Sequence, residues 1–192
     1  IAVFALIAPI VAENGLKVLL PLISVVLAVY GVCVLHALIV YSTSVKIFSG
    51  IGPREFFRKS AEAIVFAFTS ASSSATLPYS MKSAEDLGVS EPVRSFVLPL
   101  GSTINMDGTA IYQGICALFI ANVYGIELTL VQQITIVLTC TFASVGAAGI
   151  PGSAMVMLSM VLQSVGIPLE GIGLVAGIDR ITDMAPTATN IT

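Results

Sequence analysis

The chain has 192 residues, of which 56% are hydrophobic and only 10% are charged, and its formal net charge is −3. Since a soluble domain carries about 25% charged residues, this composition excludes an ordinary soluble domain and indicates a membrane protein. So small a net charge gives no reason to expect nucleic acid as a partner. The cysteines Cys33, Cys116 and Cys140 are scattered through apolar runs, which favours buried small side chains over a disulfide or a metal site.

Apolar runs dominate the first part of the chain. A membrane-spanning helix needs about 20 apolar residues, so residues 1–12 are predicted to be only the end of a span, and the sequence is interpreted as a fragment of a larger polytopic protein. The run from Val18 to Val45 has no formal charge and predicts one long, tilted helix, placed at residues 16–48.

Basic residues indicate the orientation of the chain. One group of them would share a single side of the membrane, against Lys17 alone on the other, and the positive-inside rule assigns the group to the cytoplasm. The group consists of Lys46, Arg54, Arg58, Lys59, Lys82 and Arg94.

Two later apolar regions are interrupted near their midpoints. "TSASSSATLP" breaks the first, and "SVGAAGIPGSA" breaks the second, which runs uncharged from Leu128 to Leu169. Glycine and proline in mid-segment oppose a continuous helix. Each region therefore predicts a re-entrant hairpin, at residues 54–88 and 129–168, with tips near Ser72–Pro78 and Gly146–Gly152.

A helix with polar residues at mid-length follows each hairpin. "INMDGT" lies in residues 92–126, and "GIDRITDMAPTATN" lies in residues 170–192. Irregular backbone at membrane depth must be buried in protein or face a cavity, and paired interrupted segments are typical of inverted-repeat transporters. The predicted fold is therefore an all-α polytopic membrane protein, an inverted repeat of re-entrant hairpin plus broken transmembrane helix, with residues 16–192 as one domain.

Asn105 and Asp107 are costly inside a membrane, where ionisable residues usually mark ion or substrate paths. Hard cations such as Na⁺ take carboxylate, amide and carbonyl oxygens. A helix unwound around Asn105–Gly108 would supply all three kinds of oxygen, so the segment predicts an ion site. The alternative is a kink satisfied by hydrogen bonds between helices.

The two hairpin tips are candidates for binding a substrate. Ser72–Ser74 offer hydroxyl and free N–H groups that favour a carboxylate, although small residues also serve close helix packing. Gly146, Gly149 and Gly152 suit either a flexible lid or a tight turn.

The last segment carries Asp179, Asp183 and Asn190 at spacings that put them near one helix face. Such a face suits an ammonium group or a cation, or it is simply an exposed polar face. Arg180 is adjacent to Asp179 and so points elsewhere. His36 has no obvious partner in its apolar helix and is interpreted as a packed or interhelical histidine rather than a proton relay.

Four segments together resemble one family. "SSSATLP", "LPLGSTINMDGTA", "ASVGAAGIPG" and "GIDRITDMAPTATN" are similar to the dicarboxylate/amino acid:cation symporters, the glutamate transporter family, in the right order over nearly the whole chain. The resemblance implies a multi-pass homotrimer of the cell (plasma) membrane, in which a transport domain moves like an elevator against a scaffold. Residues 1–12 would end a scaffold helix.

The resemblance also implies a substrate site and ion sites. Asp183 would hold the substrate amino group, and hydroxyl and amide groups would hold its backbone carboxylate. The implied substrate-binding residues are Ser73, Ser74, Thr109, Gly149, Asp183, Pro186, Thr187 and Asn190. The implied Na⁺ ligands are Gly101, Thr103, Asn105, Met106, Asp107, Ser144, Val145, Ala147 and Asn190. Na⁺ would be co-transported, and no organic cofactor is implied.

Pro186 departs from the family pattern. Members that carry acidic substrates have an arginine at this position, three residues after the aspartate that corresponds to Asp183, and it grips the substrate side-chain carboxylate. Without it a second carboxylate would be buried unpaired. The departure favours a neutral amino acid, with an acidic amino acid or dicarboxylate, and proton coupling, as the alternative. Pro186 should also kink its helix.

These features predict a secondary active, Na⁺-coupled symporter and not an enzyme. An ion channel on the same scaffold is the remote alternative, but no carbonyl filter or charged ring is evident. A membrane hydrolase would need a base near its serine, and neither His nor Lys lies beside Ser72–Ser74.

Overall fold

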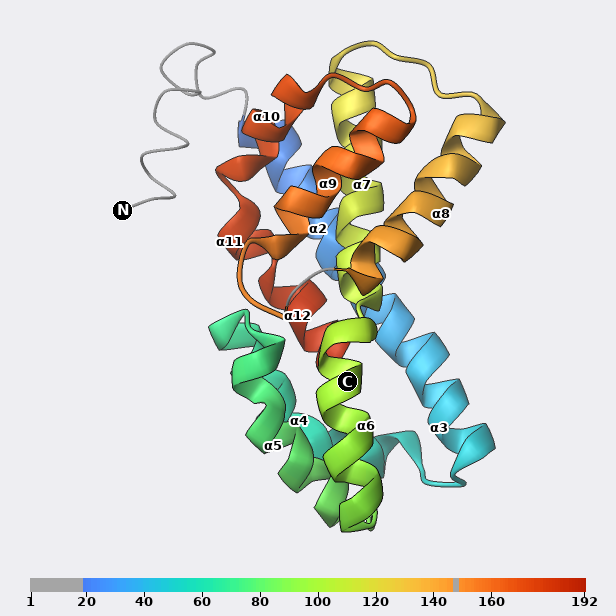
Figure 1. Cartoon of the computed structure of the whole chain (residues 1–192), viewed down its shortest axis with the longest axis vertical. Coiled ribbons are helices and arrows are strands. Elements are labelled where there is room, and N and C mark those ends of the chain that lie inside the picture. The colour runs from blue at the N-terminus through green and yellow to red at the C-terminus, as the bar shows by residue number, and fades with distance from the viewer. Residues whose placement is uncertain (1–18, 147–148) are drawn as a thin grey trace.

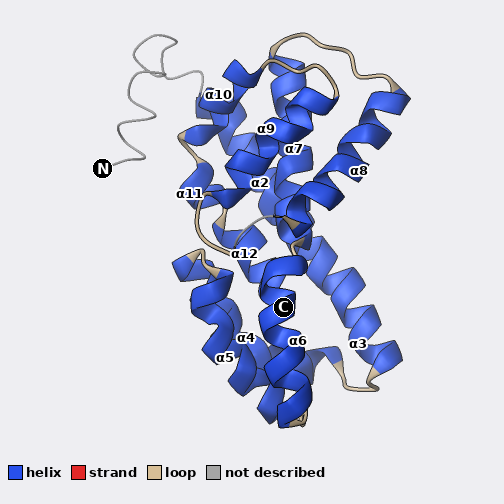
Figure 2. Cartoon of the chain, in the orientation of Figure 1, coloured by secondary structure: helices blue, strands red, loops and turns tan. Residues whose placement is uncertain are grey.

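The computed structural model describes residues 19–146 and 149–192. Within these ranges every regular element is a helix (Figure 2), which confirms the predicted all-α class. Residues 1–12 and the predicted ion ligand Ala147 lie outside the described ranges.

The first described element is one long helical rod. It consists of α2 (Leu19–His36), the π-helical turn η2 (Ala37–Tyr41) and α3 (Ser42–Phe48). One face of α2 is buried at positions three or four residues apart, which are Leu22, Val25, Val29 and Cys33. The other face of α2 exposes large apolar side chains, so α2 is apolar on both faces, which is typical of a helix between protein and lipid. The stretch Leu20–Phe48 is long and apolar enough to cross a membrane.

The first hairpin consists of α4 (Pro53–Ser70) and α5 (Ser73–Asp86), which run side by side (Figure 1). Ala71 has a φ of 49°, a left-handed conformation that ends α4. The Ser72 hydroxyl accepts a hydrogen bond from the Ala75 N–H and so caps α5. The tip is therefore shorter than the predicted Ser72–Pro78, because the serine cap restarts the helix at once and Pro78 lies inside α5.

The next helix is interrupted where the sequence predicts. It consists of α6 (Glu91–Ile104) and α7 (Asp107–Val123). Asn105 and Met106 leave the helical conformation, with φ/ψ of −83°/88° and −125°/43°. Asp107 and Gly108 already belong to the first turn of α7.

The second hairpin consists of α8 (Leu130–Val145) and α9 (Ser153–Ser164). A capping box of Thr129 and Gln132 begins α8. Gly152, with a φ of 85°, precedes α9, which is a backbone conformation that favours glycine.

The last part of the chain is several short pieces rather than the one helix predicted for residues 170–192. A 3₁₀ turn, η3 (Leu169–Gly171), leads into α10 (Ile172–Ala176), α11 (Asp179–Thr182) and α12 (Met184–Ile191). The interruption at Asp183 lies just before Pro186, so this proline falls in the first turn of α12, where its missing N–H has no intrahelical partner to lose.

The two hairpins approach each other from opposite ends of the molecule, and their tips meet near its middle (Figure 1). The Ser74 N–H and the Ser72 hydroxyl donate hydrogen bonds to the Gly149 carbonyl oxygen at 3.1 Å and 3.2 Å. Helix α7 lies between α2, α8, α9 and α12, and these elements share one apolar core. The fold thus brings two hairpin tips, the α6–α7 break and α12 to one place.

Candidate functional site

Asn190 of α12 joins the two broken helices. Its side-chain oxygen accepts hydrogen bonds from the N–H groups of Gly108 and Thr109 at 2.8 Å and 3.3 Å, and its side-chain nitrogen donates to the Thr109 hydroxyl at 3.0 Å. The Asn105 side chain donates to the Asn190 carbonyl oxygen at 3.2 Å. The first N–H groups of a helix have no partner within it, so Asn190 acts as a cap for α7 supplied by a distant part of the chain.

The backbones of α7 and α12 touch at Gly108. A Cβ atom at Gly108 would lie 2.3 Å from the Pro186 carbonyl oxygen and 2.6 Å from the Pro186 Cα. Pro186 is fully buried in this contact. Only glycine at position 108 allows the two helices to approach this closely.

A small, polar cavity lies where the hairpin tips and broken helices meet. Its volume of about 10 Å³ has room for about one water molecule, so an amino acid does not fit into the site in this conformation. It is lined by Ser73, Met106, Thr109, Gly149, Ile150, Ser153, Asp183, Thr187 and Asn190.

Most of the predicted substrate-binding residues line this cavity. Ser74 is adjacent, because its hydroxyl would lie 3.0 Å from a Cβ at Gly149, whereas Pro186 packs against Gly108 and does not line the cavity. Ile150 and Ser153 line it although the sequence did not single them out. Both residues lie directly beside the glycines predicted to form a lid, and this position is the sequence feature that could have indicated them.

The two aspartates that the sequence places on one face have different surroundings. Both are buried, but only Asp183 lines the cavity. Asp179 instead accepts a hydrogen bond from the Tyr112 hydroxyl at 3.1 Å. The backbone stays helical between them, since the Asp183 N–H donates to the Asp179 carbonyl oxygen at 2.8 Å, and Asp183 and Asn190 line the same cavity as their predicted common face implies. Arg180 is exposed, away from the cavity, as its position beside Asp179 predicts.

Replacing Tyr112 by phenylalanine should lower the free energy of unfolding by about 1–3 kcal/mol, because buried Asp179 would lose a hydrogen-bond donor. The melting temperature of the purified protein in detergent measures the effect. Tyr124→Phe is the control, since Tyr124 caps the same helix, α7, and is 44% exposed. Equal melting temperatures for Tyr112→Phe and the unmodified protein would contradict the expectation.

The predicted ion ligands fall into groups. Gly101, Asn105 and Asn190 line a second cavity of about 270 Å³ between the first hairpin and α6, and Met106 lines the small cavity. The Thr103 and Ser144 hydroxyls donate to carbonyl oxygens of their own helices, those of Leu100 and Thr141, and Val145 is exposed.

Asp107 contacts the long helical rod. Its Oδ2 atom lies 3.1 Å from Nε2 of His36 and accepts a hydrogen bond from the Tyr41 hydroxyl at 3.0 Å. The same hydroxyl lies 3.1 Å from the Thr189 carbonyl oxygen. His36 is therefore an interhelical histidine, one of the two predicted possibilities, and its partner was not obvious from the sequence because it is 71 residues away along the chain.

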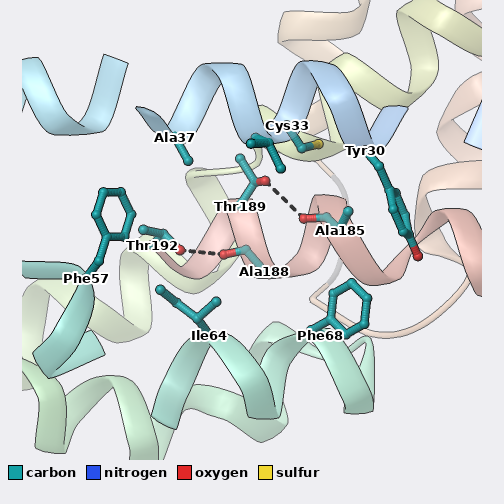
Figure 3. Close-up of a pocket in the computed structure, with 11 residues that line it drawn as sticks. Tyr30, Cys33, Ala37, Phe57, Ile64, Phe68, Ala185, Ala188, Thr189 and Thr192 are labelled. Atoms are coloured by element: carbon teal, nitrogen blue, oxygen red, sulfur yellow. Dashed lines mark hydrogen bonds between the residues drawn. The ribbon is translucent and has the colours of Figure 1, made fainter. Parts of the chain in front are cut away.

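A third cavity, also of about 270 Å³, is apolar and lies between the rod, α4 and α12 (Figure 3). Cys33 lines it from α2, and Phe57 and Phe68 line it from α4. All three cysteines are buried and unpaired, as predicted.

The fold and site define a helical membrane protein with two opposed hairpins whose tips meet beside a pocket of hydroxyl, amide and carboxylate groups. Residues 1–192 match the model of the Sodium:dicarboxylate symporter family, and the chain belongs to this family. It is an integral protein of the plasma membrane.

Three relatives illustrate the match. The chain is 40% identical to the Proton/sodium-glutamate symport protein of Geobacillus stearothermophilus over 98% of its own length and 45% of the relative's. It is 42% identical to the Proton/glutamate-aspartate symporter of Escherichia coli over 100% of its length and 44% of the relative's. It is 43% identical to Excitatory amino acid transporter 1 of Homo sapiens over 86% of its length and 32% of the relative's. The chain thus spans less than half the length of these relatives.

Proposed function

We propose that the chain forms the substrate- and ion-binding part of a cation-coupled symporter for acidic amino acids. The observation that carries this proposal is the small polar cavity where two hairpin tips and two broken helices meet. The Geobacillus and Escherichia relatives are named for glutamate and aspartate, which supports an acidic substrate. The family is one of transporters, and no catalytic reaction is proposed.

The architecture is proposed to be an inverted repeat. Each half consists of a re-entrant hairpin and a broken helix, residues 54–88 with 92–126 and residues 129–168 with 170–192. The approach of the hairpins from opposite ends supports this division (Figure 1). Residues 16–192 would move as one elevator-type domain, against a scaffold that forms a homotrimer in the bilayer.

The proposed substrate roles follow from the chemistry of the lining. Asp183 binds the amino group, since it is the acidic side chain in the lining, and Ser73, Ser74 and Asn190 bind the backbone carboxylate. Thr109 and Thr187 complete the polar wall. Because the cavity holds about one water, entry of a substrate requires the Gly149 tip to move and to release its hydrogen bonds to the serine tip.

Na⁺ is proposed as the co-transported ion. Gly101, Asn105 and Asn190 would form one site, and Asn105 and Asp107 would take part in another. Thr103, Met106, Ser144, Val145 and Ala147 would form the remaining site. The Geobacillus relative's name includes both proton and sodium, so proton coupling is the variant within this proposal, and no organic cofactor is proposed.

A neutral amino acid is the second candidate substrate. Among the described residues the small cavity is lined by Asp183 but by neither lysine nor arginine, and Arg180 is exposed elsewhere. A second substrate carboxylate would meet no cation there, and burying it unpaired is costly. Pro186, where arginine would bind that carboxylate, is what favours this candidate.

Uptake by the complete protein that carries this sequence, reconstituted in liposomes, tests both candidates. We expect labelled aspartate to accumulate under an inward Na⁺ gradient and not without Na⁺. Serine uptake that resists competition by aspartate would support the second candidate. In that case Pro186→Arg should raise the preference for aspartate about tenfold or more. Uptake of neither under any Na⁺ gradient would contradict the proposed coupling.

A further inference from the structure

His36 and Tyr41 hold one oxygen of Asp107 and leave the other open. We propose that these two side chains are positioning residues, which fix Asp107 Oδ2 so that Oδ1 is presented to the transported cation. The inference rests on the proposed function, because it assigns a purpose to Asp107 as an ion ligand.

The π-helical turn is what places both side chains on Asp107. His36 and Tyr41 are five residues apart, and in an α-helix they would point about 140° away from each other. In η2 the i→i+5 hydrogen bonding of a π-helix brings them to one side. Their rings pack edge to face with centroids 4.9 Å apart. Val40, which an uninterrupted α-helix would place there instead, is 43% exposed.

The two oxygens of Asp107 have different surroundings. An ionised carboxylate only accepts hydrogen bonds, and both the His36 ring N–H and the Tyr41 hydroxyl are directed at Oδ2. Within residues 19–146 and 149–192 no hydrogen bond reaches Oδ1, and the Asp107 side chain is 34% exposed. One oxygen is thus oriented by two donors, and the other remains for a cation, which takes oxygen ligands.

Tyr41 also ties this carboxylate to α12. Its hydroxyl lies within hydrogen-bond distance of both Asp107 Oδ2 and the Thr189 carbonyl oxygen. Figure 3 shows Thr189 against the rod beside Cys33 and Ala37. The next residue, Asn190, caps the same turn of α7 that carries Asp107. The rod, the α6–α7 break and α12 therefore form one network, and the Asp107 rotamer depends on the rod.

Loss of the Tyr41 hydroxyl tests the inference without removing the ring. In the complete protein, Tyr41→Phe should raise the Na⁺ concentration for half-maximal thermal stabilisation about tenfold, measured with NaCl replaced by choline chloride. The affinity for substrate at saturating Na⁺ should stay unchanged. Tyr30→Phe is the matched control, because Tyr30 lies on the same rod and donates to the Ile181 carbonyl oxygen at 2.7 Å, not to Asp107.

His36 supplies a rescue experiment. Glutamine places an N–H donor where histidine has Nε2, so His36→Gln should keep the Na⁺ dependence within about twofold, whereas His36→Leu should shift it as Tyr41→Phe does. An unshifted Tyr41→Phe variant, or equal shifts for Tyr41→Phe and Tyr30→Phe, would overturn the inference while the proposed function stands. An unmodified protein without any Na⁺-dependent stabilisation or uptake would overturn the proposed function, and this inference with it.

Discussion

Replacing Gly108 by alanine should lower the free energy of unfolding by roughly 1–3 kcal/mol, the usual cost of overpacking a core. The added Cβ would lie 2.3, 2.6 and 2.8 Å from three backbone atoms of Pro186. Backbone atoms cannot rotate away as a side chain can, so α12 would have to shift as a unit. That shift would disturb the hydrogen bonds from Gly108 and Thr109 to Asn190, and we expect Na⁺-dependent stabilisation and uptake to fall together.

Gly114→Ala is the control for this substitution. Gly114 lies on the same helix, α7, and a Cβ there would have no neighbour within 4 Å. Alanine should leave stability unchanged or raise it by about 0.5–1 kcal/mol, because glycine loses more conformational entropy in a helix. Thermal melting of the two variants in detergent measures the difference. Similar melting temperatures would show that the contact between Gly108 and Pro186 tolerates a side chain.

Asp183→Asn should abolish substrate binding but leave the fold intact or stabilise it. Removing one partner of a buried ion pair costs about 3–5 kcal/mol, so affinity for an amino acid should fall about 100-fold or more. Without substrate, Asp183→Asn should instead raise the free energy of unfolding. The Asp183 side chain is buried, and no lysine or arginine lines its cavity in the described part of the chain, so the neutral amide removes the cost of burying a charge.

The control is Asp179→Asn, which changes the neighbouring buried carboxylate in the same way. Asp179 does not line the cavity, and an asparagine there retains an oxygen that accepts the Tyr112 hydroxyl. Affinity should therefore stay within about threefold of the unmodified protein. Calorimetric titration with the transported amino acid and thermal melting without it measure the two effects. Retained affinity in Asp183→Asn would remove Asp183 from the proposed amino-group site.

The main helical interruptions could be predicted from local sequence. Asn105 begins the α6–α7 break, and the glycine-rich run ending at Gly152 separates α8 from α9. Such interruptions follow from backbone chemistry that each residue carries with it. The first hairpin tip is shorter than predicted because Ser72 caps α5 at once and the helix continues past Pro78.

Much of the candidate site also came from the sequence, but only through the resemblance to a family. Ser73, Asp183 and Asn190 lie far apart along the chain, and no periodicity relates them. The structure brings them to one cavity of about 10 Å³. Asp179, one helical turn before Asp183, does not line this cavity, and its carboxylate accepts the Tyr112 hydroxyl instead.

The sequence alone determined that this protein lies in a membrane, is helical, and breaks its helices at polar and glycine-rich segments, because composition and local backbone preference decide these properties. Only the tertiary structure decided which side chains meet at the breaks. The contact of His36 and Tyr41 with Asp107 depends on a π-helical turn and on packing between segments 66 and 71 residues apart. The contact between Gly108 and Pro186 depends on how closely two helix backbones approach. Both are properties of packing between distant segments, and no single segment of the chain contains them.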